Sequence, residues 1–380
     1  MLYFKHTGQQ ALVGVFDVTM VTIPVSLLFF SVFSPADQSR LRTFHIIEKS
    51  MTQSEAQAAC RTKYTDLVTV YSAEDNTELT DLINLINDPG VTAWIGLNRN
   101  QSISDKWSNG DDVTFSNLTG VCGSGSCCAA MKADGSWENL QCTEKKNFMC
   151  YKQDLTLNYH LIFDSMSWYE AQSYCRKNYT DLVSITDQNQ NEAVKIEGLK
   201  SSTSFWIGLL RDDWEWTDGG RSAYRNWETN QPWSSVDCVR LKDGKWESKP
   251  CSSVYSALCY SALIHVSDDH MSWESALDYC KKDNRNDILR IESDLDKKEV
   301  EFELRRRRVS GPLWVGLGQS RLSELLKSNK LALGPWTNWN KRQTESPPSL
   351  SCSSTDTVEK TLRQKMDMSA LRAVCEVKQP

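Results

Sequence analysis

The chain has 380 residues, a formal net charge of −6 and 13 cysteines. This length corresponds to two to four domains, and the acidic balance gives no reason to expect a nucleic-acid partner. So many cysteines favour disulfides and an oxidising compartment. A zinc site is not favoured, because the chain has no Cys-x2-Cys pair and only five scattered His.

An apolar stretch at residues 11–33 is interrupted by Asp17. Its cleanest part, 20–33, has the length of a signal-peptide core and is followed by small residues. This apolar core lies further from the first residue than is usual in a signal peptide, so Met20 is a candidate for the true start of translation. The alternative is a signal anchor, since 23 residues just span a bilayer, although Asp17 argues against it. We therefore expect residues 1–42 to be a signal peptide, or a signal anchor, with a leader. The protein is then secreted or, alternatively, a type II membrane protein.

One pattern occurs three times along the chain. It combines a Met-Ser or Met-Thr pair, a helix that carries a cysteine, an Asp-aliphatic pair and a Trp-aliphatic-Gly-Leu block. The cysteine precedes the tryptophan by 34, 31 and 34 residues, in the pairs Cys60/Trp94, Cys175/Trp206 and Cys280/Trp314. A repeat of 105 to 115 residues has the size of a whole domain rather than of a solenoid unit. The sequence thus predicts three homologous domains.

Each repeat is expected to begin with a short strand, at residues 44–47, 159–162 and 263–266. A helix follows, and Thr52-x-x-Glu55 and Ser167-x-x-Glu170 have the form of capping boxes at its start. Its cysteine lies on the buried face. A second helix is predicted to begin at Ser72, Thr186 and Ser293, with short strands closing each unit. Two helices with many short antiparallel strands and a long irregular loop make an α+β fold.

The order of landmarks resembles the C-type lectin-like domain. The second repeat shows it best, in Trp214-Glu-Trp-Thr-Asp-Gly219, Tyr224-Arg-Asn-Trp227, Cys238, Gly244-Lys-Trp246, Cys251 and Cys259. The resemblance covers about residues 43–377, and a tandem array of this kind is similar to the macrophage mannose receptor group or a secreted relative. It implies three separately folded domains at 43–152, 157–260 and 262–377, the third degenerate.

The resemblance also implies the disulfides. An outer bridge joins the first helix to the last strand, and an inner bridge holds the long loop. The implied pairs are Cys60–Cys150, Cys128–Cys142, Cys175–Cys259, Cys238–Cys251 and Cys280–Cys375. Cys122 and Cys127 remain for a small extra loop, but the sequence does not decide which of Cys127 and Cys128 joins Cys142. Cys352 is left over, as a free or intermolecular thiol.

Sugar-binding members of this family hold one calcium ion with a Glu-Pro-Asn or Gln-Pro-Asp motif, a nearby Glu and an Asn-Asp pair. Calcium prefers six to eight oxygen ligands, several of them charged. In the second repeat, Trp233 follows Gln231-Pro232 where an acid or amide is expected, and Ser248 follows Glu247 where an aspartate is expected. The first repeat lacks the motif, and the third has Glu345-Ser-Pro-Pro348 in a different order. We expect no cofactor, because this oxygen count does not favour calcium at the usual sugar site.

The candidate ligand-binding residues all belong to the second repeat: Asn226, Gln231, Trp233, Asp237 and Glu247. An exposed aromatic side chain in a loop is suited to stacking on a sugar ring or to anchoring a protein. An equally good interpretation is that Trp233 packs on the core of its own loop. For the first and third repeats, a spacer role and a binding role fit the sequence equally.

Three N-glycosylation acceptors are present, at Asn100, Asn117 and Asn178. Asn117 occupies the place of the family's Asn-Trp landmark, where burial would block modification. The run Arg305–Arg308 suits a helix C-terminus; its alternatives are a polyanion-binding patch and a protease cleavage site before Val309.

No nucleophile elbow, Walker loop or His-Glu-x-x-His motif is present, so an enzyme is not expected. The sequence therefore favours an extracellular recognition protein for glycans or extracellular proteins. The alternatives are a calcium-dependent lectin acting through the second repeat, and a matrix or adhesion protein with spacer domains. A membrane partner is expected only if the N-terminal segment is an uncleaved anchor.

Overall fold

The structure is a computed structural model. It describes residues 41–86, 90–122, 126–153, 157–291, 294–309, 311–317, 352–356, 361–365 and 370–378. The expected signal segment and the Glu345-Ser-Pro-Pro348 motif lie outside these ranges. In the part of the chain that is described, no helix combines the length and apolarity needed to cross a membrane.

Repeat 1 contains β1 (Arg42–Met51), α1 (Gln53–Lys63), β2 (Asp66–Leu67), α2 (Ala73–Asn84), β3 (Ala93–Trp107), β4 (Leu118–Thr119), β5 (Cys127–Met131), β6 (Trp137–Gln141) and β7 (Lys146–Gln153). Repeat 2 contains β8 (Leu157–Met166), α3 (Trp168–Asn178), β9 (Asp181–Leu182), α4 (Gln188–Gly198), β10 (Phe205–Trp216), β11 (Cys238–Lys242), β12 (Lys245–Lys249) and β13 (Tyr255–Ala262). The mixture of helices and short strands confirms the predicted α+β class.

Local signals set the starts of α1, α2 and α3 as predicted, whereas the cap of α4 is Asp187 and not the predicted Thr186. At α3 the backbone N–H of Ser167 donates to the Glu170 carboxylate at 2.8 Å, and the Glu170 N–H donates back to Ser167 Oγ at 3.3 Å. This capping box satisfies two amides that the first helical turn leaves unpaired. The same box is present at Thr52, and Ser72 caps α2. The helix cysteines are fully buried, so the predicted buried face is confirmed.

The glycine of the repeated Trp-Ile-Gly-Leu block also has a packing reason. A Cβ atom on Gly208 would lie 2.9 Å from the carbonyl oxygens of both Leu182 and Val183. Real Cβ atoms do not approach backbone so closely, so only glycine allows β10 to pass against this segment.

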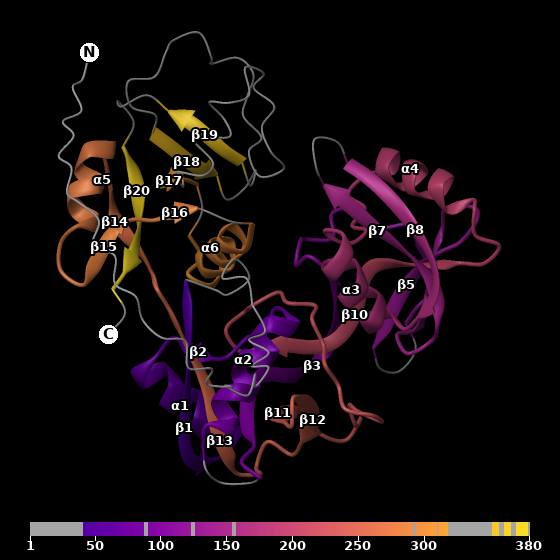
Figure 1. The fold of residues 1–380 in the computed structure, drawn as a ribbon, viewed down its shortest axis with the longest axis horizontal. Helices are drawn as coiled ribbons and strands as arrows, with labels where there is room; N and C mark the ends of the chain where they lie inside the picture. Colours follow the sequence, from indigo (N-terminus) through magenta and orange to yellow (C-terminus); the bar gives the residue numbers. More distant parts are fainter. Residues whose placement is uncertain are drawn as a thin grey trace, which may run out of the picture. The chain divides into compact units, whose positions relative to one another are not determined.

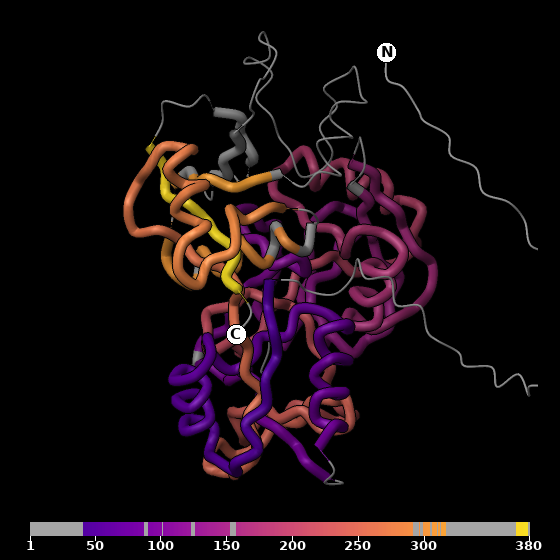
Figure 2. Tube along the Cα trace, turned by 60° about the vertical axis from the view of Figure 1, so that its left-hand side comes forward, coloured from indigo at the N-terminus to yellow at the C-terminus, as the bar shows by residue number. Residues whose placement is uncertain are grey.

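Strand pairing exchanges the halves of the first two repeats. β1 of repeat 1 pairs antiparallel with β13, the last strand of repeat 2, from Arg42↔Ala262 to Met51↔Tyr255. Reciprocally, β7 at the end of repeat 1 pairs with β8 at the start of repeat 2. Figure 1 shows β13 beside β1 and β7 beside β8. In Figure 2 the indigo first half of repeat 1 and the salmon second half of repeat 2 form one unit.

We call the two resulting units the outer module (residues 42–98 and 214–262) and the inner module (residues 105–211). Each has a core drawn from both repeats. The outer core packs Val68 and Leu79 of repeat 1 against Trp214 and Trp246 of repeat 2. The inner core packs Trp107, Trp137 and Met149 against Val183 and Ile207. The prediction that 43–152 and 157–260 fold separately is therefore wrong for this structure.

The disulfides follow the exchange. Cys60 pairs with Cys259, and Cys150 pairs with Cys175, so the predicted outer bridges Cys60–Cys150 and Cys175–Cys259 are wrong. The physical reason is that each helix cysteine bonds to the last strand of the module it packs in, and that strand comes from the other repeat. The inner bridges Cys128–Cys142 and Cys238–Cys251 are confirmed. Cys122 joins Cys127, which settles the alternative that the sequence left open.

The exchange occurs where β3 and β10 run straight on after the Trp-Ile-Gly-Leu block. The two strands pair antiparallel with each other, from Leu209↔Trp107 to Trp216↔Leu97. A hairpin at this point would need a turn, but neither 98–106 nor 210–213 contains Gly or Pro. Short hinges that would strain a hairpin turn favour exchange over hairpin closure.

Repeat 3 contains β14 (Ile264–Met271), α5 (Trp273–Cys280), β15 (Arg285–Ile288), β16 (Arg290–Ile291), α6 (Asp294–Arg306), β17 (Pro312–Leu317), β18 (Cys352–Asp356), β19 (Thr361–Lys365) and β20 (Leu371–Val377). Its strands pair among themselves, and the predicted bridge Cys280–Cys375 is confirmed. The arginine run ends α6, as predicted: Arg306 and Arg307 both form ion pairs with Glu303. The side chain of the leftover Cys352 is outside what the structure describes.

Candidate functional site

The candidate site is the loop from Asn226 to Asp237, which joins β10 to β11 in the outer module. Its Gln231–Pro232 peptide bond is cis. Trp227 forms an isolated bridge with Trp246 at the start of the loop, so the fully buried Trp246 anchors the loop on the core.

Gln231 and Ser248 tie the middle of the loop to β12. Gln231 Oε1 accepts hydrogen bonds from Ser248 N at 2.9 Å and from Ser248 Oγ at 2.7 Å. The Trp233 N–H in turn donates to Ser248 Oγ at 2.8 Å. Ser248 is fully buried. The amide oxygen and the hydroxyl are therefore used by the protein itself, at positions where the resemblance described above implies metal ligands.

Glu247 is held by two cations. Its Oε2 lies 2.8 Å from Arg240 Nη2 and 2.9 Å from Lys249 Nζ. Burial disfavours the charged carboxylate, but the hydrogen bonds and charges of Arg240 and Lys249 outweigh it and lower the pKa of Glu247. The carboxylate is thus ionised and already neutralised. These two partners lie outside the family motif, although residues 247 and 249 share one face of β12 by strand alternation.

Trp233 is the residue that the site presents to solvent. Its side chain is 49% exposed, whereas Trp214, Trp227 and Trp246 pack together in the interior. Lys249 Nζ lies 5.0 Å from the Trp233 ring centroid, within the range of a cation–π contact. The indole is therefore about half exposed to solvent and is contacted by Lys249, an arrangement that suits a stacking surface. The alternative that Trp233 is packed within its own loop fits less well with this exposure.

The remaining two candidates have different environments. Asn226 Nδ2 donates to the Gly244 carbonyl at 2.7 Å, and Lys245 Nζ donates to Asn226 Oδ1 at 2.8 Å. The corresponding residue of repeat 1, Asn117, makes the same bond to Gly135 at 2.8 Å. A bond repeated in a module without the loop motif is structural, so Asn226 supports the loop rather than faces a ligand.

Asp237 has a side chain that is 62% exposed, and one carboxylate oxygen lies 3.3 Å from Arg99 Nε. It is accessible at the end of the loop. Arg99 comes from repeat 1 and belongs to none of the motifs that predicted the site.

The oxygen donors of this loop do not fit a calcium ion. Gln231 and Ser248 bond each other, Glu247 is paired with two cations, and Trp233 supplies no side-chain oxygen. Calcium takes six to eight oxygen ligands, and none of these three side chains offers it a free oxygen-bearing group. Across the described ranges, no group of three or more His, Cys, Asp and Glu side chains has an arrangement that could hold a metal ion.

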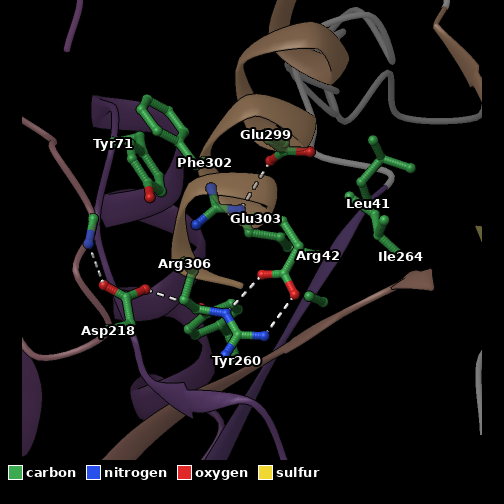
Figure 3. A pocket seen from close by; sticks show the side chains of 12 residues that line it. Leu41, Arg42, Tyr71, Asp218, Tyr260, Ile264, Glu299, Phe302, Glu303 and Arg306 are labelled. Carbon is green, nitrogen blue, oxygen red and sulfur yellow. Dashed lines mark hydrogen bonds and ion pairs between the residues drawn. The ribbon is translucent and has the colours of Figure 1, made fainter. Parts of the chain in front are cut away.

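A second candidate is a small cavity of about 20 Å³ beside α6 (Figure 3). It is lined by charged and aromatic side chains, among them Arg42, Tyr71, Asp218 and Glu299. Arg42 is mostly buried and pairs with Asp75 and Glu299, both at 2.9 Å. Burial raises the pKa of Asp218 despite its hydrogen bonds to Thr69, Gly220 and Tyr260. The cavity holds about one water molecule, so we interpret it as part of a packed polar interface and not as a ligand site.

The glycosylation acceptors also differ in environment. Asn100 and Asn178 are exposed, whereas Asn117 is partly buried and its amide nitrogen is bonded to Gly135. This bond agrees with the expectation that packing hinders modification at Asn117. Use of any of the three acceptors remains a prediction.

Comparison with known proteins places the repeats. The family model described as the lectin C-type domain matches residues 49–152 and 164–261. Lymphocyte antigen 75 of Homo sapiens is 28% identical over 257 residues, which cover 56% of this chain and 15% of that protein. E-selectin of Bos taurus is 34% identical over 131 residues, which cover 31% of this chain and 27% of that protein. The secretory phospholipase A2 receptor of Homo sapiens is 26% identical over 205 residues, which cover 44% of this chain and 14% of that protein.

Among solved structures, human lithostathine is similar at 13% identity with a TM-score of 0.28, covering 60% of this chain and 95% of that chain. The chain spans about a quarter or less of the length of the three curated relatives. Because the family model matches more than half of the 380 residues, the chain belongs to the C-type lectin domain family.

Proposed function

We propose that this chain is an extracellular recognition protein that binds a carbohydrate or protein ligand through the loop Asn226–Asp237 and does not need calcium for it. The observation that carries the proposal is the half-exposed Trp233, held on a loop whose potential metal ligands are engaged within the protein. Aromatic side chains on supported loops provide large contact area at little entropic cost.

The relatives support the recognition class. One is named as a receptor for a secreted phospholipase, and others are selectins. Their domains share family membership with this chain, so we infer a glycan or an extracellular protein as ligand. The intramolecular disulfides fit secretion into an oxidising compartment. The type II membrane alternative depends on the N-terminal segment, and we propose secretion because Asp17 interrupts that segment.

Binding of the purified full chain to a glycan array and to a panel of immobilised serum and mucus proteins tests the proposal, with and without EDTA. We expect the chelator to leave binding unchanged. Trp233→Ala should weaken binding by about 1–2 kcal/mol, about five- to thirty-fold. Phe163→Ala, which removes another exposed aromatic from the inner module, is the matched control and should have no effect.

Two results would lead to other functions. Loss of binding in EDTA with no effect of Trp233→Ala would indicate a calcium-dependent lectin. Binding that survives both treatments but is confined to matrix proteins would indicate an adhesion protein in which repeat 2 is a spacer.

A further inference from the structure

Arg99, on β3 of repeat 1, makes its side-chain contacts with repeat 2. Its Nη2 donates to the Trp233 carbonyl at 2.8 Å, its Nη1 bonds Asp213 at 2.5 Å, and its Nε lies 3.3 Å from Asp237 Oδ1. The guanidinium also lies 4.5 Å from the ring centroid of Trp214. One side chain thus joins the tip of the loop, its end and the strand before it.

The backbone of Arg99 adds a further link. Its N–H donates to the Asp237 carbonyl at 2.8 Å, so main chain and side chain hold the same end of the loop. The Arg99 side chain is only 16% exposed. Arginine presents five donors in a planar fork and stacks on an aromatic face at the same time, which lysine cannot do. These contacts fix the position and direction of the Trp233 backbone within the loop.

The equivalent residue of repeat 2 provides an internal comparison. Arg211 lies five residues after Trp206, as Arg99 lies five after Trp94. Arg211 bonds Asp105 at 2.8 Å and Asn139 at 3.2 Å, both in repeat 1. Each repeat therefore contributes an arginine to the other. The contacts differ in kind, because Arg211 does not hold a loop with an exposed tryptophan.

We infer that Arg99 is a positioning residue for the Trp233 loop, so that the binding site of repeat 2 is completed by repeat 1. This inference rests on the proposed function for its effect on binding, but not for its effect on the loop. It follows directly from the exchange, which carries β3 alongside β10 and β11. Neither repeat expressed alone would contain the whole site.

Hydrogen exchange of the full chain without ligand tests the positioning role. In Arg99→Gln, amides in the peptide covering 229–237 should exchange at least about tenfold faster, because the loop loses bonds to a charged donor. Arg211→Gln is the matched control and should leave that peptide unchanged. Arg99→Lys keeps the charge but not the fork, and should give an intermediate rate. Unchanged exchange of the loop in both Arg99 variants would overturn the inference.

Ligand binding is the second measurement. It uses those immobilised glycans and proteins to which the unmodified chain binds. If Arg99 acts through the loop, Arg99→Gln should weaken binding about as much as Trp233→Ala, and the double variant should be no weaker than either. A double variant whose losses add would show that Arg99 acts elsewhere and would overturn the inference. If Trp233→Ala does not change binding while Arg99→Gln loosens the loop, the proposed function fails and the positioning role stands.

Discussion

The exchanged arrangement predicts which bridges cross the boundary between the repeats. Cys60–Cys259 and Cys150–Cys175 both span the segment between Gln153 and Leu157. A specific protease site inserted there tests the arrangement directly. After cleavage and without reductant, we expect the chain to run as one band, because both bridges hold the fragments together.

The entropy of the crosslinks does not choose between the two arrangements. The chain-entropy relation assigns about 3.5 kcal/mol to a loop of 25 residues and about 5.3 kcal/mol to one of 199. Pairing within the repeats would close loops of about 90 and 84 residues, worth about 4.6 kcal/mol each. Either set amounts to about 9 kcal/mol, so the noncovalent contacts of β3 and β10 must decide.

Those contacts include ion pairs between the repeats, Lys106–Asp212 and Arg99–Asp213, both at 2.5 Å. Gel electrophoresis of the cut protein, with and without reductant, distinguishes the two disulfide arrangements. Reduction should release two fragments, which is the control for complete cleavage. Two bands before reduction would show that Cys60 pairs with Cys150 and Cys175 with Cys259, and the reasoning from strand pairing would be refuted.

Three further predictions concern the hinge and pH. Asp212→Ala leaves the cations of Lys106 and Arg225 buried without their shared partner, so urea denaturation should show that the free energy of unfolding falls by about 3–5 kcal/mol. Asp112→Ala, in an exposed ion pair, is the control and should lower it by less than about 1 kcal/mol. A Gly-rich insertion after Asp212 should permit hairpin closure and convert part of the cut, unreduced protein to two bands; an unchanged single band would show that the hinge does not control the exchange. Burial lowers the pKa of His45 below its usual 6.5, so the unfolded chain binds more protons and stability should fall as pH drops below about 6.5; His45→Gln should reduce this slope, and an equal slope in both proteins would rule out His45 as its source.

Much of the local structure could be predicted from the sequence, because its signals act over a few residues. The capping boxes at Thr52 and Ser167, the buried helix cysteines and the inner bridges depend on spacing within one half of a repeat. The exchange could not be predicted in this way. Homologous repeats present the same complementary surfaces, so every landmark is satisfied whether a half packs on its own repeat or on its neighbour.

The candidate site shows the same division. Gln231, Trp233 and Glu247 were recognisable from the sequence because they lie on the family's motif. The contacts of Glu247 with Arg240 and Lys249 could have been predicted from strand alternation, because residue 240 on β11 pairs with residue 247 on β12. Arg99 was not, since it lies more than a hundred residues before the loop and reaches it only through the exchange.

Exchange changes what a tandem repeat can do. In an array of separate domains, each loop is supported by its own repeat, and the loss of one domain leaves the others intact. Here the loop that bears Trp233 is anchored by Trp246 of repeat 2 and held by Arg99 of repeat 1. Asn76 of repeat 1 accepts the indole N–H of Trp246 at 2.8 Å, so even the anchor depends on the other repeat. The smallest unit that contains the complete site is therefore the pair of repeats, and binding measured on either repeat alone would underestimate it.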